Sequence, residues 1–384
     1  MKDKQTNYPQ LRFKGFTDPW EQRKVSELAD RYDNLRVPIT ASERVAGETP
    51  YYGANGIQDY VEGFTHNGEF VLVAEDGAND LQNYPVQYVD GKVWVNNHAH
   101  VLQAKEERVD NKFLTNALKH TNIEPYLVGG GRAKLNADVM MKINFKVPTL
   151  PEQVQIGKFF DNLDHLITLH QRKLTKLKEL KQGYLQKMFP QNGSKFPQLR
   201  FAGFADAWEQ RKLGEVATFL NGRAYKQDEL LDSGKYKVLR VGNFYTNDSW
   251  YYSNMELGDK YYVDKGDLVY TWSATFGPHI WSGEKVIYHY HIWKVKLSKF
   301  LDRNFTLQLL EADKARLLSS TNGSTMIHVT KGDMESKIVS IPNIDEQKQI
   351  GSFFKQLDNT ITLHQCKLEK LQELKKGYLQ KMFC

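Results

Sequence analysis

Residues 167–189, ITLHQRKLTKLKELKQGYLQKMF, return almost unchanged as residues 361–383, ITLHQCKLEKLQELKKGYLQKMF, with 19 of the 23 positions identical. A second duplicated stretch opens each half of the chain. PQLRFKGFTDPWEQRKVSELAD at 9–30 recurs as PQLRFAGFADAWEQRKLGEVAT at 197–218, with 15 of 22 positions identical. The chain is therefore a tandem repeat of two halves, about 8–189 and 196–383, joined by the linker PQNGSK at 190–195.

The duplicated stretch 152–189 predicts one long helix, because it contains no proline and its apolar positions alternate spacings of three and four. Polar His and Lys interrupt this heptad seam at matching places in the two copies. We expect the two helices to pair within the chain as an antiparallel coiled coil; packing on their own domains or on a second chain is the alternative. The seam positions are Phe160, Leu163, Ile167, His170, Leu174, Leu177, Lys181, Tyr184 and Met188, then Phe354, Leu357, Ile361, His364, Leu368, Leu371, Lys375, Tyr378 and Met382.

The stretches between the repeated segments, about 31–147 and 219–341, differ strongly from each other in sequence. Both contain short β-branched and aromatic runs bounded by Gly, Asn and Asp, such as EFVLVAEDG and GDLVYTWSATFG, which indicate strands and turns. The expected fold class is α+β, with two β-rich domains that are each followed by a long helix. The expected divisions are a domain at 1–150, a helix at 151–189, the linker 190–195, a domain at 196–344 and a helix at 345–384.

Composition sets broad limits on function. The chain has 384 residues, a net charge of +6 and a pI near 8.9, which allows binding to a polyanion without requiring it. Its two cysteines, Cys366 and Cys384, indicate a reducing compartment and no disulfide framework. No secretory signal and no apolar run of membrane-spanning length is visible, so we expect a cytoplasmic protein.

Two variable domains that alternate with near-identical long helices, together with WEQRK at each domain entry and LPEQ or NIDEQ before each helix, resemble one family. It is the DNA-specificity subunit of type I restriction–modification systems. The resemblance implies a cytoplasmic bacterial or archaeal protein. Each domain would be a target recognition domain that reads one half of a bipartite double-stranded DNA site, and the helices would set the unread spacer.

The resemblance also implies the partners and cofactors. The helices would dock two methyltransferase subunits, and restriction subunits would join through the complex. S-adenosylmethionine, ATP and Mg²⁺ would belong to these partners, with no cofactor bound by this chain. Consistently, the sequence contains no G-x-x-x-x-G-K-[ST] loop and no Gly-rich nucleotide fingerprint, so we expect a non-catalytic chain.

Base and phosphate contacts need amide, hydroxyl, aromatic or basic side chains on loops that reach DNA. Two Gly-bearing loops, GGGRAKLN and TNGSTMIHVT, sit at matching places and are candidates as units, although a turn former or an ordinary surface polar group explains any single residue better than a base contact does. In the first domain the candidates are Arg44, Tyr52, Asn55, Asn79, Asn96, Asn97, His98, Arg132 and Lys134. In the second they are Arg223, Lys226, Arg240, Asn243, Tyr245, Trp272, Ser273, Thr275, Asn322, Ser324, Thr325 and His328.

Two further patterns leave alternatives open. HAHVLQA at 98–104 parallels HYHIWKV at 289–295, and His-x-His on a strand occurs in metal sites. Because no cysteine or carboxylate cluster accompanies these histidines in the sequence, we expect structural or DNA-proximal roles and no metal. For the whole chain, the alternative to DNA recognition is a coiled-coil scaffold that binds proteins without sequence-specific DNA binding. Salt-dependent, sequence-selective DNA binding distinguishes the two.

Overall fold

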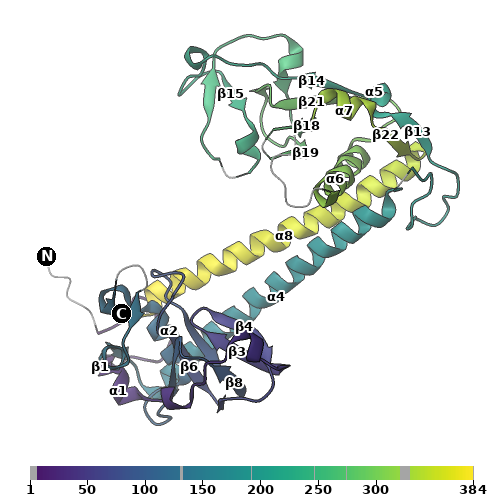
Figure 1. The fold of residues 1–384 in the computed structure, drawn as a ribbon. Helices are drawn as coiled ribbons and strands as arrows, with labels where there is room; N and C mark the ends of the chain where they lie inside the picture. The colour runs from purple at the N-terminus through teal and green to yellow at the C-terminus, as the bar shows by residue number, and fades with distance from the viewer. Residues whose placement is uncertain are drawn as a thin grey trace. The chain divides into compact units, whose positions relative to one another are not determined.

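The computed structural model describes residues 7–129, 133–191, 193–245, 247–273, 275–320 and 329–383 (Figure 1). The chain divides into two compact units: Met1–Gln171 with Cys366–Cys384, and Arg172–Gln365. Each unit holds one β-rich domain and parts of both long helices, α4 (Leu150–Met188) and α8 (Ile344–Met382). Both helices therefore begin in one unit and end in the other. In the described residues, no helix combines the length and apolar character needed to cross a membrane.

The first unit contains two four-stranded sheets, with strand orders β2-β9-β6-β7 and β4-β3-β8-β5, and two two-stranded ribbons, β1-β12 and β10-β11. Its strands are β1 (Glu21–Lys24), β2 (Ala29–Arg31), β3 (Ala46–Gly53), β4 (Gly56–Val61), β5 (His66–Asn67), β6 (Phe70–Ala74), β7 (Val86–Val89), β8 (Lys92–Val95), β9 (Ala99–Ala104), β10 (Leu127–Val128), β11 (Lys134–Leu135) and β12 (Asn144–Val147). Its short helices are α1 (Val25–Leu28), η1 (Asp33–Leu35), η2 (Ala41–Glu43), α2 (Asn111–His120), η3 (Glu124–Tyr126) and α3 (Ala137–Met140).

The second unit repeats this plan with sheets β14-β21-β18-β19 and β16-β15-β20-β17 and the ribbon β13-β22. Its strands are β13 (Glu209–Lys212), β14 (Ala217–Asn221), β15 (Tyr236–Leu239), β16 (Tyr251–Ser253), β17 (Tyr262–Val263), β18 (Leu268–Thr271), β19 (Gly277–Ile280), β20 (Val286–Tyr288), β21 (Ile292–Leu297) and β22 (Ile338–Ile341). Its short helices are α5 (Leu213–Val216), η4 (Gln227–Glu229), η5 (Val241–Phe244), η6 (Asp259–Tyr261), α6 (Arg303–Ser320) and α7 (Lys331–Ser336).

Each domain has a central strand that serves two cores. In β6 the alternation of side chains sends Val71 and Val73 into one cluster and Phe70 and Leu72 into another, so the whole strand is buried. The strand β18 of the second unit divides in the same way, with Leu268 and Tyr270 in one cluster and Val269 in another. These runs are continuous apolar stretches in the sequence because both faces of the strand are covered.

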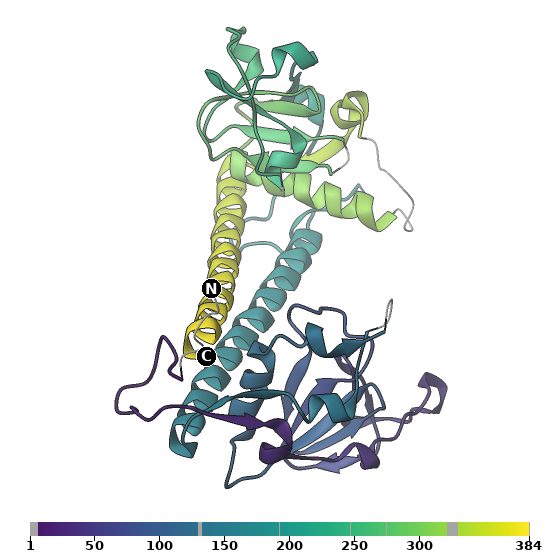
Figure 2. The same cartoon turned by 90° about the vertical axis from the view of Figure 1, so that its left-hand side faces the viewer.

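The two long helices pack antiparallel in both units. In the first, Phe159 meets Tyr378 at 5.0 Å between ring centroids, and Asp164 accepts a hydrogen bond of 2.5 Å from Lys375. The contacts therefore move to lower residue numbers along α8 as they move to higher residue numbers along α4. The second unit has the matching contacts, Tyr184 to Phe353 at 5.0 Å and Lys181 to Asp358 at 2.6 Å. Figure 2 draws α8 in yellow alongside α4 in teal.

Every position of the predicted seam is buried or half-buried, whereas most positions between them are exposed. The two seam lysines have acidic partners on the opposite helix. Asp164 and Asp358 lie one residue beyond a seam position, and each forms an ion pair with the seam lysine of the other helix. A charged pair at the edge of the apolar stripe makes one helix register preferable to its neighbours.

The tip of each long helix is part of the core of the other repeat's domain. Phe383 stacks on Phe113 at 5.5 Å between ring centroids and lies 6.1 Å from Trp20. In the second unit, Phe189 lies 5.5 Å from Phe305 and 6.3 Å from Trp208. The repeated sequence YLQKMF therefore ends in an apolar plug, whose removal would open a cavity next to the buried tryptophan.

The Glu-Gln pair at the start of each long helix fastens the domain to it. Glu152 is fully buried and binds Arg12 through two hydrogen bonds of 2.7 Å. Gln153 accepts from the Asp110 backbone, and Asp110 caps α2. These contacts explain why PQLRF and the Glu-Gln pair are duplicated together, although they lie about 140 residues apart.

The second repeat makes the same contacts with its own residues. Arg200 binds the fully buried Glu346 at 2.7 and 2.8 Å. Gln347 accepts from the Asp302 backbone, and Asp302 accepts from the amide of Phe305 at the start of α6. The Arg–Glu and Gln–Asp contacts between domain and helix therefore recur in both units.

Candidate nucleic-acid interface

Several of the predicted DNA-binding residues of the first domain gather at one edge of its two sheets. The side chain of Asn55, in the turn between β3 and β4, donates to the carbonyl of Gly77 at 2.9 Å. Its oxygen accepts from the amide of Asn79 at 2.9 Å. A single asparagine therefore fastens the turn of one sheet to the loop that follows β6 in the other.

The turn between β8 and β9 joins the same edge. The amide of Asn96 donates to the carbonyl of Tyr52 at 3.1 Å, and its side chain accepts from the amide of His98. His98 in turn contacts Asp76 through Nδ1 at 2.5 Å. Asn96 is only 4% exposed, so it shapes the turn and is not available to DNA.

We call this edge the polar rim. Its accessible side chains offer amide donors and acceptors, imidazole and ammonium groups, which are the groups that read base edges and bind phosphates. Its members are Tyr52, Asn55, Asn79, Asn97, His98 and Lys134.

Two predicted residues of the first domain are not on this rim. Arg44 lies over the ring of Tyr51 at 4.3 Å and forms an ion pair with Asp59 at 3.3 Å. It therefore belongs to the β3–β4 ribbon, away from the turn at Asn55. Arg132 lies outside the described residues.

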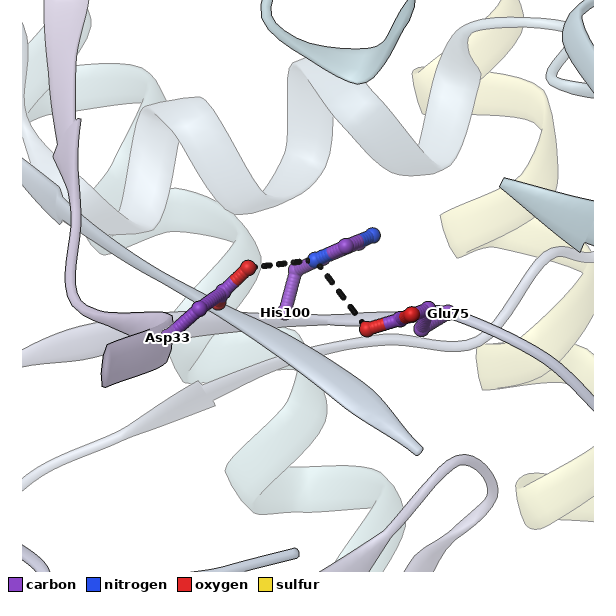
Figure 3. Close-up of side chains that lie close together, drawn as sticks. All are labelled: Asp33, Glu75 and His100. Carbon is purple, nitrogen blue, oxygen red and sulfur yellow. Dashed lines mark hydrogen bonds and ion pairs between the residues drawn. The ribbon is translucent and has the colours of Figure 1, made fainter. Parts of the chain in front are cut away.

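Behind the polar rim lies a buried charge network that the sequence did not indicate (Figure 3). His100 is 1% exposed, and its Nδ1 lies 2.7 Å from Asp33 and 3.6 Å from Glu75. Its Nε2 lies 2.8 Å from the carbonyl oxygen of Leu135. The Leu135 carbonyl can only accept, so Nε2 is the donor in that hydrogen bond, and Nδ1 faces the two carboxyl groups.

The expectation that no carboxylate cluster accompanies this histidine is wrong. Asp33 and Glu75 both lie beside His100, although they come from distant parts of the chain. Asp33, Glu75 and His100 could each offer a metal ligand atom within 4.8 Å of the others. However, Glu75 already binds Arg36 at 2.7 Å and Lys134 at 2.9 Å. The chain's own cations balance both carboxylates, and we assign the cluster as an ion-pair network.

The pKa directions agree with this assignment. Burial alone would raise the pKa of Asp33 and Glu75, but their hydrogen bonds and the nearby positive charges outweigh burial and hold both pKa values below the usual range. The Glu75 carboxylate also raises the pKa of Lys134. The network thus fastens β11, and with it Lys134 of the polar rim, to the sheet.

The second domain presents aromatic groups at the equivalent strands. Trp272 donates through Nε1 to the carbonyl of Tyr290 at 2.9 Å, and its ring lies 5.0 Å from that of His291. His289 lies 4.4 Å from Tyr290 and stacks on Tyr225 at 6.4 Å between ring centroids. We call these five residues the aromatic cluster; within it, Tyr290 is 39% exposed.

A second aromatic group includes Tyr245, which was predicted, and His279, which was not. His279 stacks on Phe244 at 4.3 Å, and its Nε2 lies 3.2 Å from the hydroxyl of Tyr245. Burial, with Lys314 nearby, lowers the pKa of His279 to about 4. Burial, with His291 and Arg240 nearby, lowers the pKa of His289 to about 4. Both rings are therefore neutral near pH 7, suited to stacking and hydrogen bonds and not to ion pairing with phosphates.

Other predicted residues of the second domain have internal partners. Arg223 binds Glu229 at 2.7 Å, and Asn243 holds its own loop through two backbone carbonyls. Arg240 lies over the ring of Tyr251 at 4.2 Å. The side chains of Lys226 and Thr275 are exposed and that of Ser273 is half-buried, near the turns that they were predicted to occupy. The remaining candidates, Asn322, Ser324, Thr325 and His328, lie outside the described residues.

Comparison with known proteins finds one family model in both halves of the chain. The family model of the type I restriction modification DNA specificity domain matches the chain twice, at residues 17–179 and 205–373. The chain belongs to this family of DNA specificity subunits. The two matches contain both β-rich domains and most of both long helices, so they account for the internal repeat.

The similarity to relatives and to solved structures extends over almost the whole chain. A Haemophilus influenzae protein, provisionally named a type I restriction enzyme specificity subunit, is 32% identical over 356 residues, with 89% of each chain covered. The crystal structure of the type I restriction–modification S subunit from M. genitalium has a TM-score of 0.71 at 15% identity, covering 98% of this chain and 99% of that one. A chain from a structural study of complex assembly in the type I R-M system has a TM-score of 0.54 at 14% identity, with 96% and 98% covered.

The residues of this specificity subunit that sequence reasoning missed have a common property. Asp33, Glu75, His279 and Tyr290 are brought beside the predicted residues by strand pairing between distant segments. In the sequence, the one visible signal was the paired His-x-His pattern, which marks the strand starts at 98–100 and 289–291. The residues that lie beside these histidines can be identified only from the folded structure.

Proposed function

We propose that each β-rich domain of this specificity subunit reads one half of a bipartite DNA target, and that the chain itself is non-catalytic. The proposal rests on one contrast: the contacts that join domain to helix are alike in the two units, whereas the exposed surfaces of the domains differ. The ion pair between Arg12 and Glu152 in the first unit matches the ion pair between Arg200 and Glu346 in the second. The surfaces at the equivalent strands do not match, since one is the polar rim and the other the aromatic cluster. One frame thus supports two different reading surfaces.

Reading by the two surfaces would use different chemistry. Amide groups of the polar rim, such as that of Asn97, can form paired hydrogen bonds with adenine, and Lys134 can bind guanine or phosphate. In the aromatic cluster, Trp272 can contact a thymine methyl group, and the neutral His289 can accept from an exocyclic amine. Each well-placed pair contributes about 1–3 kcal/mol of discrimination between bases.

The long helices would hold the partners. Leu169 and Leu363 occupy the same place in the two copies, and each is about half exposed, at 52% and 53%. Exposed leucines on a helix favour contact with another apolar helix face. We propose that the helices dock two methyltransferase subunits and that restriction subunits join through the complex. S-adenosylmethionine, ATP and Mg²⁺ would be bound by those subunits, in the cytoplasm of a bacterium or archaeon.

A domain exchange tests the reading function. Residues 31–147 are replaced by the matching segment of another specificity subunit, and methylated sites are mapped across the genome of cells that carry the complete system. We expect one half of the target to change while the other half and the spacer stay the same. A change in both halves, or methylation that no longer depends on sequence, would contradict the division of labour.

An insertion tests the role of the helices in spacing. Because the helices pair antiparallel, four residues are added to both, at 172–176 and at the equivalent 366–370. Four residues lengthen each helix by about 6 Å and keep the seam as a stutter. The unread spacer should then grow by about one or two base pairs, at roughly 3.4 Å each. An unchanged spacer in the methylation map would rule out the helices as the ruler.

A further inference from the structure

Lys134 is the lysine of the polar rim, and both its backbone and the tip of its side chain are held in place. Its backbone pairs with Asp76 in an isolated antiparallel β-bridge, and the amide of the next residue, Leu135, donates to the carbonyl of Glu75 at 2.7 Å. Its ammonium group lies 2.9 Å from Glu75 Oε1. The side chain is nevertheless 46% exposed, so this ammonium group lies at the surface with a fixed partner.

Glu75 is itself fixed from behind. Its second oxygen, Oε2, accepts a hydrogen bond of 2.7 Å from Arg36 and lies 3.6 Å from Nδ1 of His100 (Figure 3). Arg36 also donates to a backbone carbonyl at the start of β9 at 2.9 Å, and the amide of Glu75 donates to a carbonyl of the turn between β8 and β9 at 2.8 Å. The side chains of Glu75 and Arg36 are 14% and 15% exposed. Glu75 is therefore a fixed anchor that determines where the ammonium group of Lys134 lies.

This anchoring suits contact with a base edge. A lysine that is free at the surface loses rotamer freedom when it binds, and it binds phosphates as a mobile point charge. Lys134 has already lost much of that freedom, because Glu75 holds the tip of its side chain. An ammonium group carries three hydrogens, so the ion pair leaves it able to donate to further acceptors. In the major groove, the N7 and O6 atoms of guanine are such acceptors.

The local charge balance disfavours a phosphate as the partner of Lys134. Three carboxyl groups, those of Asp33, Glu75 and Asp76, surround two permanent cations, Arg36 and Lys134. A phosphate brought to Lys134 would therefore meet little net positive charge, and it would lie close to the Glu75 carboxylate. A guanine edge carries no net charge and avoids this repulsion.

We propose that Lys134 reads a guanine in the first half-site and that Glu75 is the residue that positions Lys134 for this contact. The inference rests on the proposed function, which supplies the DNA, and it decides between guanine and phosphate as the partner of Lys134. Arg36 and His100 contribute by holding Glu75. At the equivalent strands of the second domain the aromatic cluster takes this place, so the contact belongs to one half-site only.

The test uses the full chain assembled with the methyltransferase subunits of the same system. Competition binding is measured at several salt concentrations on duplexes in which each base pair of the target is changed in turn. The variants are Lys134→Met, Glu75→Gln and the double variant. Lys92→Met is the matched control, because Lys92 is exposed at the start of β8, whereas the polar rim lies beyond the end of that strand. Thermal midpoints check folding, and if Glu75→Gln does not fold, the exposed Lys134→Met still decides between guanine and phosphate.

Lys134→Met should reduce the preference at one G·C pair of the first half-site by about ten-fold or more. The second half-site and the dependence of affinity on salt should not change, because no phosphate contact is lost. Glu75→Gln should relax the same base pair while binding to unrelated DNA stays equal or becomes tighter, since a negative charge near the DNA is removed. The double variant should lose no more than Lys134→Met alone, because Glu75 acts through Lys134. Lys92→Met should keep every preference.

A first half-site without a G·C pair would overturn the inference. So would a Lys134→Met variant that binds all sequences equally less well with a shallower salt dependence, because that pattern marks a phosphate contact. Wild-type preference in a folded Glu75→Gln variant would overturn the positioning role of Glu75. A wild-type complex without any half-site preference would contradict the proposed function instead, and that result is distinguishable because it does not depend on Lys134.

Discussion

Replacing Arg12 by leucine should unfasten the first domain from its helix at a large and calculable cost. Glu152 is fully buried and accepts both of its 2.7 Å hydrogen bonds from this guanidinium, whose own side chain is 13% exposed. Arg12→Leu leaves that carboxylate buried and unpaired. Breaking a buried ion pair in this way costs about 3–5 kcal/mol. Arg12→Leu with Glu152→Met should recover most of the loss, because replacing both partners by apolar groups removes the uncompensated charge.

Urea unfolding and hydrogen–deuterium exchange together measure this effect. Arg12→Leu should lower the unfolding midpoint and speed exchange in the peptide that covers residues 7–20. The peptide 195–208 of the second repeat should be unaffected. Arg200→Leu should give the mirror-image result, since Arg200 binds Glu346 with the same geometry.

The exposed pair of Arg23 and Glu21 supplies the control. Their side chains are 42% and 68% exposed, so Arg23→Leu should change the unfolding free energy by no more than about 1 kcal/mol. If Arg12→Leu costs no more than Arg23→Leu, burial of the Glu152 charge is not what matters. The same conclusion would follow if the double variant were no more stable than Arg12→Leu alone.

Three further predictions concern packing, pH and connectivity. Gly157→Ala should destabilise the first unit by about 1–3 kcal/mol in calorimetry, because its Cβ would lie 2.5 Å from Asp110 Oδ1. The pKa values of His279 and His289 are lowered to about 4, so the second unit should keep its full stability above pH 6.5. It should lose up to about 3 kcal/mol per histidine as the pH falls from 6.5 towards 4. Replacing both histidines by glutamine should make the thermal midpoint independent of pH over that window. Joining the chain ends with a copy of the 190–195 linker and opening the chain within the original linker should preserve the circular dichroism spectrum, because the hydrogen bond that ties each PQLRF segment to a helix end is made in both units. A permuted chain that is unfolded would contradict this reading of the repeat.

Sequence reasoning succeeded where the relevant contacts repeat along a short stretch of chain. The alternation of three and four identifies the side of α4 that is buried, and its seam positions Phe160, Leu174 and Met188 are indeed buried. It did not supply the partner of Lys181, because Asp358 lies 177 residues away and is polar, with no periodic signal of its own. Similarly, no sequence motif links Asp33 to His100, since only the pairing of β2 with β9 brings them together.

The DNA-facing candidates show the same limit. Asn55 and Asn79 could be proposed because Asn in a turn between strands is often exposed, and the structure places both on the polar rim. Asn96 and Asn243 carry the same sequence signal, yet their side chains are used inside their own loops. Side-chain type in a turn cannot distinguish a residue that shapes the loop from one that the loop presents.

The sequence alone determined the duplicated frame, the buried side of each long helix and the resemblance to the DNA specificity family. These depend on internal identity and on helical periodicity, both of which are local properties of the chain. Only the tertiary structure decided which residues share a surface. It brought together the buried network around His100 and the aromatic cluster around Trp272. Such groupings arise from contacts between segments far apart in the chain, for which a single sequence carries no periodic signal.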